Sequence, residues 1–283
     1  LGSIASALNG KIPVIWNIQA SIRQREAYKP MTALMVALGW GFSRLTHGII
    51  FNSLNGKEGH EKIGYISRKN LFIPNGFDLD LFRPDEQSRK QVQEELAVPE
   101  HAPCIGLFAR FHPVKAHHIF LEAAEKILNV QRKARFILCG EGCDERNELL
   151  GAWIHKFHLL NSVHLLGRRD DMPKVMAAMD LVVSCSLSEG FSNVIGEAMA
   201  CEVPCVVTDV GDSSLIVGET GSVIPPNDPE ALSEAVLKIL DMSREERKNL
   251  GHKARIRIQD HFSIQAVVEK YETVYRASLG GAF

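Results

Sequence analysis

The residues best suited to chemistry lie in the stretch 188–200, where an apolar run gives way to a helical pattern. Ser192 or Asn193 can cap this helix, which leaves backbone amides free at its start. Free amides and the positive end of the helix dipole suit a phosphate group. Two carboxylates, Glu189 and Glu197, lie just before and inside the helix. The stretch therefore predicts an anion site with two acidic side chains beside it.

Those carboxylates need ligands other than the phosphate, which they would repel. Carboxylate oxygens are strong acceptors for hydroxyl donors, so sugar or ribose hydroxyls are the expected partners of Glu189 and Glu197. Arg110 and Lys115, just after another apolar run, supply positive charge for a diphosphate. The alternatives are ordinary surface charges at these two residues and a role for Glu189 in stabilising the helix dipole.

A sheet must position these residues, and from about residue 103 short apolar runs alternate with stretches of helical period, such as 116–129. Continuous apolar strands indicate a sheet that is covered on both faces, so we predict a parallel, doubly wound α/β domain. Ligands bind such domains beyond the carboxyl ends of the strands. The expected strands are 104–108, 135–139, 162–165, 181–185 and 205–208.

The loops of this domain lack the signatures of two common nucleotide-binding classes. Gly140-Glu141-Gly142 follows a strand, but the third glycine of a dinucleotide-binding motif is absent, and no P-loop signature occurs. A dehydrogenase and a P-loop NTPase are therefore disfavoured.

Composition indicates a globular chain. Of its 283 residues 45% are hydrophobic and 23% are charged, a length and composition that allow two packed domains. Residues 1–84 carry a net charge of +5 and the remainder −7. The basic first part fits an anionic partner, a membrane surface or a solvated face with no partner. We expect no nucleic acid partner.

The cysteines indicate a reducing compartment, hence a cytoplasmic protein. Four of the six lie in apolar runs, where reduced and buried thiols are common: Cys104, Cys139, Cys185 and Cys205. The spacings Cys139-x3-Cys143 and Cys201-x3-Cys205 differ from those of tight zinc knuckles, so we expect buried thiols rather than a metal site.

The part before residue 103 is too short for a complete domain. Strands are expected at 13–16, 47–51 and 71–73, with an apolar helix over 31–43 and a last amphipathic helix over 264–276. We predict a partial first domain (1–84), a linker (85–102), a second domain (103–262) and a closing helix (263–283).

The helix over 31–43 is interpreted as part of the first domain's core, and a membrane-facing patch around Trp40 is the alternative. We expect neither a transmembrane anchor nor a secretion signal. Because the first residue is Leu1 rather than Met, we also expect a missing start.

Several motifs in order resemble the retaining GT-B glycosyltransferases of family 4. They cover most of residues 48–275 and are Ile73-Pro74-Asn75-Gly76-Phe77-Asp78, Phe82-Arg83-Pro84, the run 108–115, Cys139-Gly140-Glu141-Gly142, Leu166-Gly167, the E-x7-E element from Glu189 to Glu197, and Val210-Gly211-Asp212.

This resemblance implies two Rossmann-like domains, the first partial here, with a nucleotide-sugar donor bound mainly by the second. Arg110 and Lys115 would neutralise the donor diphosphate. Glu197 would accept the ribose hydroxyls, and Glu189 would contact the transferred sugar. The resemblance implies three further groups of donor contacts. At the helix start they are Gly190, Phe191, Ser192 and Asn193. Around the base they are Gly140, Gly142 and the segment Gly167–Arg169, which includes Arg168, and in the interdomain cleft they are Asn75 and Gly76.

The implied reaction moves a hexose from a UDP- or GDP-type donor to a glycan, glycolipid or lipid-linked acceptor, with retention of anomeric configuration. No cofactor and no metal are expected, because the Arg/Lys pair and the helix dipole would stabilise the leaving diphosphate. Such an enzyme would serve polysaccharide biosynthesis in the cytoplasm or peripherally at the inner membrane surface.

The sequence departs from the family pattern at several positions. Ala109, Ala116 and Glu202 stand where glycine is usual, and Ala20 stands where relatives often carry a histidine. The Gly-rich loop expected early in the first domain is not present. These departures leave two alternatives open, a non-catalytic nucleotide-sugar-binding remnant and a GT-B epimerase.

Overall fold

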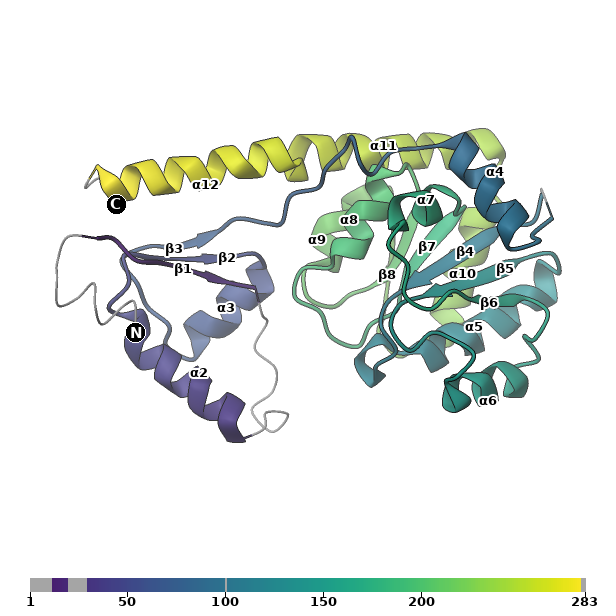
Figure 1. Ribbon diagram of the computed structural model, residues 1–283, viewed down its shortest axis with the longest axis horizontal. Coiled ribbons are helices and arrows are strands. Elements are labelled where there is room, and N and C mark those ends of the chain that lie inside the picture. Colours follow the sequence, from purple (N-terminus) through teal and green to yellow (C-terminus); the bar gives the residue numbers. More distant parts are fainter. Residues whose placement is uncertain (1–11, 20–29, 100, 281–283) are drawn as a thin grey trace. The chain divides into compact units, whose positions relative to one another are not determined.

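The computed structural model describes residues 12–19, 30–99 and 101–280, which form two compact units (Figure 1). The first unit comprises the chain up to Gly76, the segment Glu189–Phe191 and the chain from Ile264 onward. The second comprises Phe77–Ser188 and Ser192–Ser263. The first unit thus ends earlier than residue 84, and the helix expected to close the chain groups with it.

The first unit is built on a three-stranded parallel sheet in the order β1-β2-β3. The expected strands and helices are found here within two residues of the expected starts. The elements of this unit are β1 (Ile15–Ile18), α2 (Pro30–Ser43), β2 (Gly48–Phe51), α3 (Leu54–Lys62), β3 (Asn70–Phe72) and α12 (Ile264–Leu279).

Strand β2 is apolar throughout because both of its faces are covered (Figure 1). Ile49 and Phe51 point to one face and form a cluster to which Val36 of α2 belongs. Ile50 points to the other face and packs with Val267 of α12. All three strand residues are fully buried, and each contributes roughly 1.5–3 kcal/mol to stability.

Helix α2 is only partly a core helix, so its interpretation as core is wrong for one of its faces. Its inner face is tied down where the Tyr65 hydroxyl donates to the carbonyl oxygen of Val36 at 2.8 Å. On the outer face, Leu34, Met35 and Leu38 are 53%, 63% and 47% exposed. Trp40 is 43% exposed in the described chain. No helix formed by the described residues has both the length and the apolar character needed to cross a membrane.

The second unit is the predicted doubly wound α/β domain. Its six strands are all parallel in the order β6-β5-β4-β7-β8-β9, which is the order of a dinucleotide-binding fold. The elements are α4 (Glu86–Glu95), β4 (Cys104–Phe108), η2 (Pro113–Lys115), α5 (His117–Val130), β5 (Arg135–Cys139), α6 (Glu148–Lys156), β6 (Val163–Leu165), α7 (Met172–Ala177), β7 (Leu181–Ser184), α8 (Asn193–Ala200), β8 (Cys205–Thr208), α9 (Ser213–Val217), η3 (Gly218–Thr220), β9 (Ser222–Ile224), α10 (Pro229–Leu240) and α11 (Arg244–Phe262).

Helices cover both faces of this sheet, as its continuous apolar strands require. Figure 1 shows α5, α6 and α10 on one face and α7, α8, α9 and α11 on the other. Helix α4, which was expected in a linker, packs against α7, and its Arg89 donates to both oxygens of Asp180 at 2.9 and 3.0 Å. Strand β9, which the sequence interpretation missed, has only three residues.

Candidate active site

The loops after β4 and β5 are joined by backbone hydrogen bonds at the carboxyl edge of the sheet. The amide of Ala109 donates to the carbonyl oxygen of Cys139 at 2.9 Å, and the amide of Phe111 donates to that of Glu141 at 2.7 Å. The loop that carries Arg110 is therefore fixed beside the loop that carries Gly140 and Gly142. The sequence placed both loops at one ligand site, and the structure brings them together.

The loop after β6 joins the same edge. The amide of Gly140 donates to the carbonyl oxygen of Gly167 at 2.8 Å, and the amide of Gly167 donates to that of Cys143 at 2.8 Å. Gly140 has φ +153°, and a Cβ atom there would lie 2.2 Å from the carbonyl oxygen of Ala109. Any side chain at this position would force the loops apart, which explains why it is glycine.

Arg110 lies shortly before a tight turn, and Lys115 is the last residue of that turn. The η2 turn begins where the His112 ring accepts a hydrogen bond from the amide of Val114 at 3.2 Å. Arg110 is exposed and forms no hydrogen bond or ion pair with another described residue. Lys115 is half-buried at the end of the turn. Ala116 follows in the left-handed region at φ +51°, a conformation that glycine adopts more readily than alanine.

The turn with Lys115 is bonded to the segment that follows β7. The amide of Leu187 donates to the carbonyl oxygen of Val114 at 2.7 Å, and the Cys185 thiol donates to that of Lys115 at 3.4 Å. This segment leads along the chain to α8. The two stretches that the sequence interpretation singled out, one cationic and one at a helix start, thus share the carboxyl edge of the sheet.

Helix α8 begins after Ser192, which occupies the cap position but whose side chain accepts no hydrogen bond from the helix. Ser192 is buried and Asn193 is exposed. The prediction that a side chain caps this helix is therefore wrong for Ser192. The uncapped amides at the start of an eight-residue helix remain suited to an anion.

The carboxylate of Glu197, on α8, is desolvated and would be stabilised by a bound ligand. Its side chain is half-buried on α8, and burial raises the pKa of its carboxyl above the ordinary value. The carboxylate forms no hydrogen bond or ion pair with any other residue that the structure describes, and only the backbone carbonyl of Glu197 accepts a hydrogen bond, from the amide of Cys201 at 3.2 Å. A desolvated carboxylate without donors is costly, so hydroxyl donors from a ligand would stabilise it.

Two contacts that the sequence did not reveal hold α8 in place. The ring of Phe77 packs directly on Gly196. Arg255 of α11 donates to the carbonyl oxygen of Ala200 at the end of α8 and, at 2.9 Å, to that of Leu79. Phe77 lies in the recognised motif 73–78, but only the tertiary fold shows that its ring contacts α8.

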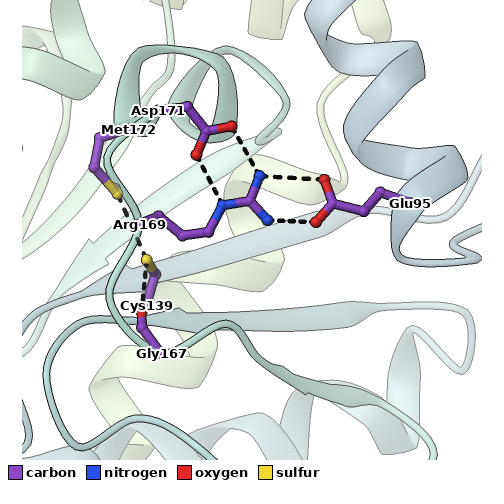
Figure 2. Close-up of polar contacts among 6 residues, drawn as sticks. All are labelled: Glu95, Cys139, Gly167, Arg169, Asp171 and Met172. Carbon is purple, nitrogen blue, oxygen red and sulfur yellow. Dashed lines mark hydrogen bonds and ion pairs between the residues drawn. The ribbon is translucent and has the colours of Figure 1, made fainter.

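Arg168 and Arg169 have different surroundings. Arg168 is exposed and has no hydrogen-bond or ion-pair partner among the described residues. Arg169 is instead held between Glu95 and Asp171, as Figure 2 shows. We expected the segment Gly167–Arg169 to border the base. In this segment the hydrogen-bond donors of Arg169 are bound by Glu95 and Asp171, whereas those of Arg168 are available to a ligand.

The predicted residues Asn75, Gly76, Glu189, Gly190 and Phe191 belong to the first unit. There the Asn75 amide oxygen accepts a hydrogen bond from Asn52 at 3.3 Å. A Cβ atom at Gly76 would lie 2.8 Å from the Cα atom of Ile264, so this position must be glycine. Ala20 lies outside the described residues. The roles assigned to these residues stay predictions.

All six cysteines are buried and free, which confirms the four predicted buried thiols. Burial raises the pKa of Cys139 to about 11 and that of Cys143 to about 12. The Cys143 sulfur lies 3.4 Å from Nε2 of His117, which is itself 2% exposed. Across residues 12–19, 30–99 and 101–280, no three His, Cys, Asp or Glu side chains gather in a way that could hold a metal ion.

The family model described as glycosyl transferases group 1 matches residues 102–242. An N-acetyl-alpha-D-glucosaminyl L-malate synthase of Bacillus anthracis is 28% identical over 187 residues, which cover 65% of this chain and 48% of that protein. A UDP-Gal:alpha-D-GlcNAc-diphosphoundecaprenol alpha-1,3-galactosyltransferase of Escherichia coli is 29% identical, over 72% of this chain and 53% of that protein. The chain thus spans about half the length of these curated relatives.

Solved structures share the fold. The crystal structure of Alr3699/HepE from Anabaena in complex with UDP and glucose has a TM-score of 0.85 at 24% identity, with 98% of this chain and 74% of that chain covered. The structure of WaaG, a glycosyltransferase involved in lipopolysaccharide biosynthesis, has a TM-score of 0.75 at 18% identity, with coverages of 93% and 75%. These likenesses confirm the predicted GT-B type of α/β fold.

Three findings agree on the family. The sequence motifs occur in the expected order, the loops that carry them meet with the start of α8 at one edge of the sheet, and the family model matches the same part of the chain. Residues 102–242, which lie almost entirely in the second unit, therefore form a domain of the glycosyl transferases group 1 family.

Proposed function

We propose that this chain transfers a hexose from a nucleoside diphosphate sugar to a glycan, glycolipid or lipid-linked acceptor, with retention of anomeric configuration. The observation that carries the proposal is the half-buried carboxylate of Glu197, which has no partner among the described residues and lies on α8, the helix whose preceding segment is hydrogen-bonded to the turn that ends at Lys115. In this arrangement Glu197 accepts the ribose hydroxyls, and the cations and the α8 amides bind the diphosphate.

The donor is proposed to be of the UDP type, with GDP as the alternative. One relative is a UDP-Gal-dependent enzyme by name, and the Anabaena structure holds UDP and glucose. In the transfer, the bond between the anomeric carbon and the diphosphate oxygen breaks while the acceptor oxygen bonds to the same carbon. The acceptor proton passes to the departing diphosphate. The protein positions the reactants and stabilises the leaving-group charge, with Glu189 proposed to contact the transferred sugar.

This chemistry needs no metal ion in our proposal, because Arg110, Lys115 and the start of α8 supply positive charge where the diphosphate departs. Donor turnover should therefore be unchanged by EDTA. Loss of turnover on chelation, with recovery on adding Mg²⁺ or Mn²⁺, would contradict this part of the proposal.

Calorimetric titration with UDP and GDP tests donor binding. Arg110→Ala and Lys115→Ala should each weaken binding of the preferred nucleotide about 10- to 100-fold, because each removes a charge-assisted contact of about 1.5–3 kcal/mol. Arg132→Ala and Lys133→Ala are the matched controls, since both side chains are exposed just before β5, at the opposite edge of the sheet. Unchanged affinity in the first two variants would refute the site.

Donor turnover with a panel of acceptors separates an enzyme from a non-catalytic remnant. A transferase forms a new glycoside, whereas a remnant binds donor and transfers nothing. A GT-B epimerase would release nucleotide without forming any acceptor glycoside.

A lipid-linked acceptor is supported by two observations. The Escherichia coli relative is named for a diphosphoundecaprenol acceptor. In addition, α2 exposes Leu34, Met35 and Leu38 on one face of the first unit. We therefore propose a peripheral membrane contact by α2. Co-sedimentation with anionic vesicles should be lost in a Leu34→Ser, Met35→Ser variant, and equal sedimentation of both proteins would contradict it.

A further inference from the structure

Arg169 connects two helices of the second unit through a double ion pair (Figure 2). On one side its Nε and Nη2 atoms donate to the two carboxylate oxygens of Asp171, both at 2.8 Å. On the other side Nη1 and Nη2 donate to the carboxylate of Glu95, with the Nη2 bond at 3.2 Å. Glu95 is the last residue of α4, and Asp171 immediately precedes α7.

All three guanidinium nitrogens of Arg169 are occupied in this arrangement, so its side chain has little left to offer a ligand. The side chain is 21% exposed, while those of Glu95 and Asp171 are 48% and 37% exposed. The hydrogen-bonded guanidinium of Arg169 lowers the pKa of the Asp171 carboxyl below its ordinary value. A planar fork bound on two sides is more restrictive than a single surface pair.

The segment that contains Arg169 is also fixed at its two ends. The Cys139 thiol lies 3.1 Å from the carbonyl oxygen of Gly167 and 3.5 Å from the Met172 sulfur (Figure 2). Gly167 is further bonded to the Gly140–Cys143 loop through its own amide and carbonyl. Between these fixed ends lies Arg168, which is exposed and has no partner among the described residues. The clamp of Arg169 therefore determines the backbone course of a short exposed segment, at the edge where the donor is proposed to bind.

We propose that Arg169 is a positioning residue for nucleobase binding, which acts by clamping the Gly167–Met172 segment between Glu95 and Asp171. Arg169 itself does not touch the ligand. It fixes the backbone of Arg168 beside Gly167, which is held by the Gly140–Cys143 loop. These two residues then meet the base, while the diphosphate is held elsewhere, by Arg110 and Lys115. This inference depends on the proposed donor site. It adds that the base and the diphosphate are bound by separate groups of residues.

Because separate residues bind the base and the diphosphate, we predict that loss of the Arg169 ion pairs weakens the binding only of ligands that carry a base. Calorimetry would compare UDP with inorganic pyrophosphate on the wild type and on Arg169→Met. UDP affinity should fall about 10-fold, and pyrophosphate affinity should stay within twofold. Arg276→Met is the matched control, because Arg276 forms an exposed ion pair with Glu272 within α12 and is 81% exposed.

A second variant tests whether a loss of UDP affinity in Arg169→Met reflects a general loss of structure. Glu95→Gln removes the charge of one arm of the clamp and leaves Asp171 in place, so it should lower UDP affinity less than Arg169→Met and leave pyrophosphate binding unchanged. Equal losses for UDP and pyrophosphate, or no loss for UDP in either variant, would overturn the inference. Failure of the wild type to bind UDP or GDP would instead refute the proposed function, and this inference would fall with it.

Discussion

The ring of Phe77 packs on Gly196, the residue that precedes Glu197 in α8. A Cβ atom at Gly196 would lie 2.1 Å from Cζ of Phe77, a distance that no packed side chain can accommodate. Phe77 is in turn anchored to the end of α11, since its amide donates to the carbonyl oxygen of Phe262 at 2.8 Å. The position of Glu197 thus depends on a contact between two residues that are 119 positions apart.

Gly196→Ala is expected to lower the free energy of unfolding by about 1–3 kcal/mol, because the added methyl group must displace the Phe77 ring. Urea denaturation monitored by circular dichroism measures this change. Gly151→Ala is the control, since Gly151 lies in helix α6 and a Cβ there meets nothing within 4 Å. The control should gain stability, by up to about 1 kcal/mol. Equal effects of the two substitutions would contradict the packing described.

Glu197→Gln is expected to stabilise the unliganded protein while it weakens UDP binding. Burial raises the pKa of this carboxyl, so the folded state binds its proton more tightly than the unfolded state. The carboxyl therefore costs stability as pH rises from its ordinary pKa through the raised one, and the cost persists at neutral pH. Denaturation at a series of pH values should show that the variant lacks this loss. The exposed Glu234→Gln is the control.

His117 should make the fold sensitive to acid. Burial lowers the pKa of His117 to about 4, so the unfolded state binds the proton more tightly, and stability falls as pH drops from about 6.5 to about 4. The loss attributable to this group amounts to roughly 3 kcal/mol. His117→Gln should have a shallower dependence of unfolding free energy on pH than the wild type. The exposed His155→Gln should follow the wild type, and parallel curves for all three proteins would rule this role out.

The architecture of the second unit was predictable because its strands are buried on both faces and therefore continuously apolar. The run 104–108 predicted β4 with its bounds, and 135–139 predicted β5. Strand β9 was missed because three residues, one of them exposed, give no such run. The interpretation of α2 was wrong for one face because the helix is apolar on all sides. Such a sequence does not indicate which face is buried and which is exposed to solvent.

The site was predictable to the extent that its residues belong to local motifs. Arg110, Lys115 and Glu197 follow strands in the sequence, and parallel strands bring such loops to one edge. The contacts of Arg169 with Glu95 and of Phe77 with Gly196 join residues that are remote in sequence. No spacing rule reveals them, because they depend on how α4, α8 and the chain before α4 pack.

Glu197 is proposed to bind the ribose of the donor through its carboxylate. The most direct test of this role is calorimetry with UDP and 2′,3′-dideoxy-UDP on the wild type and on Glu197→Gln. We predict that the substitution weakens UDP binding about 10- to 100-fold and leaves the affinity for the dideoxy ligand nearly unchanged, because the hydroxyl donors to the carboxylate are then absent. An equal loss of affinity for both ligands, or none for UDP, would contradict the claim.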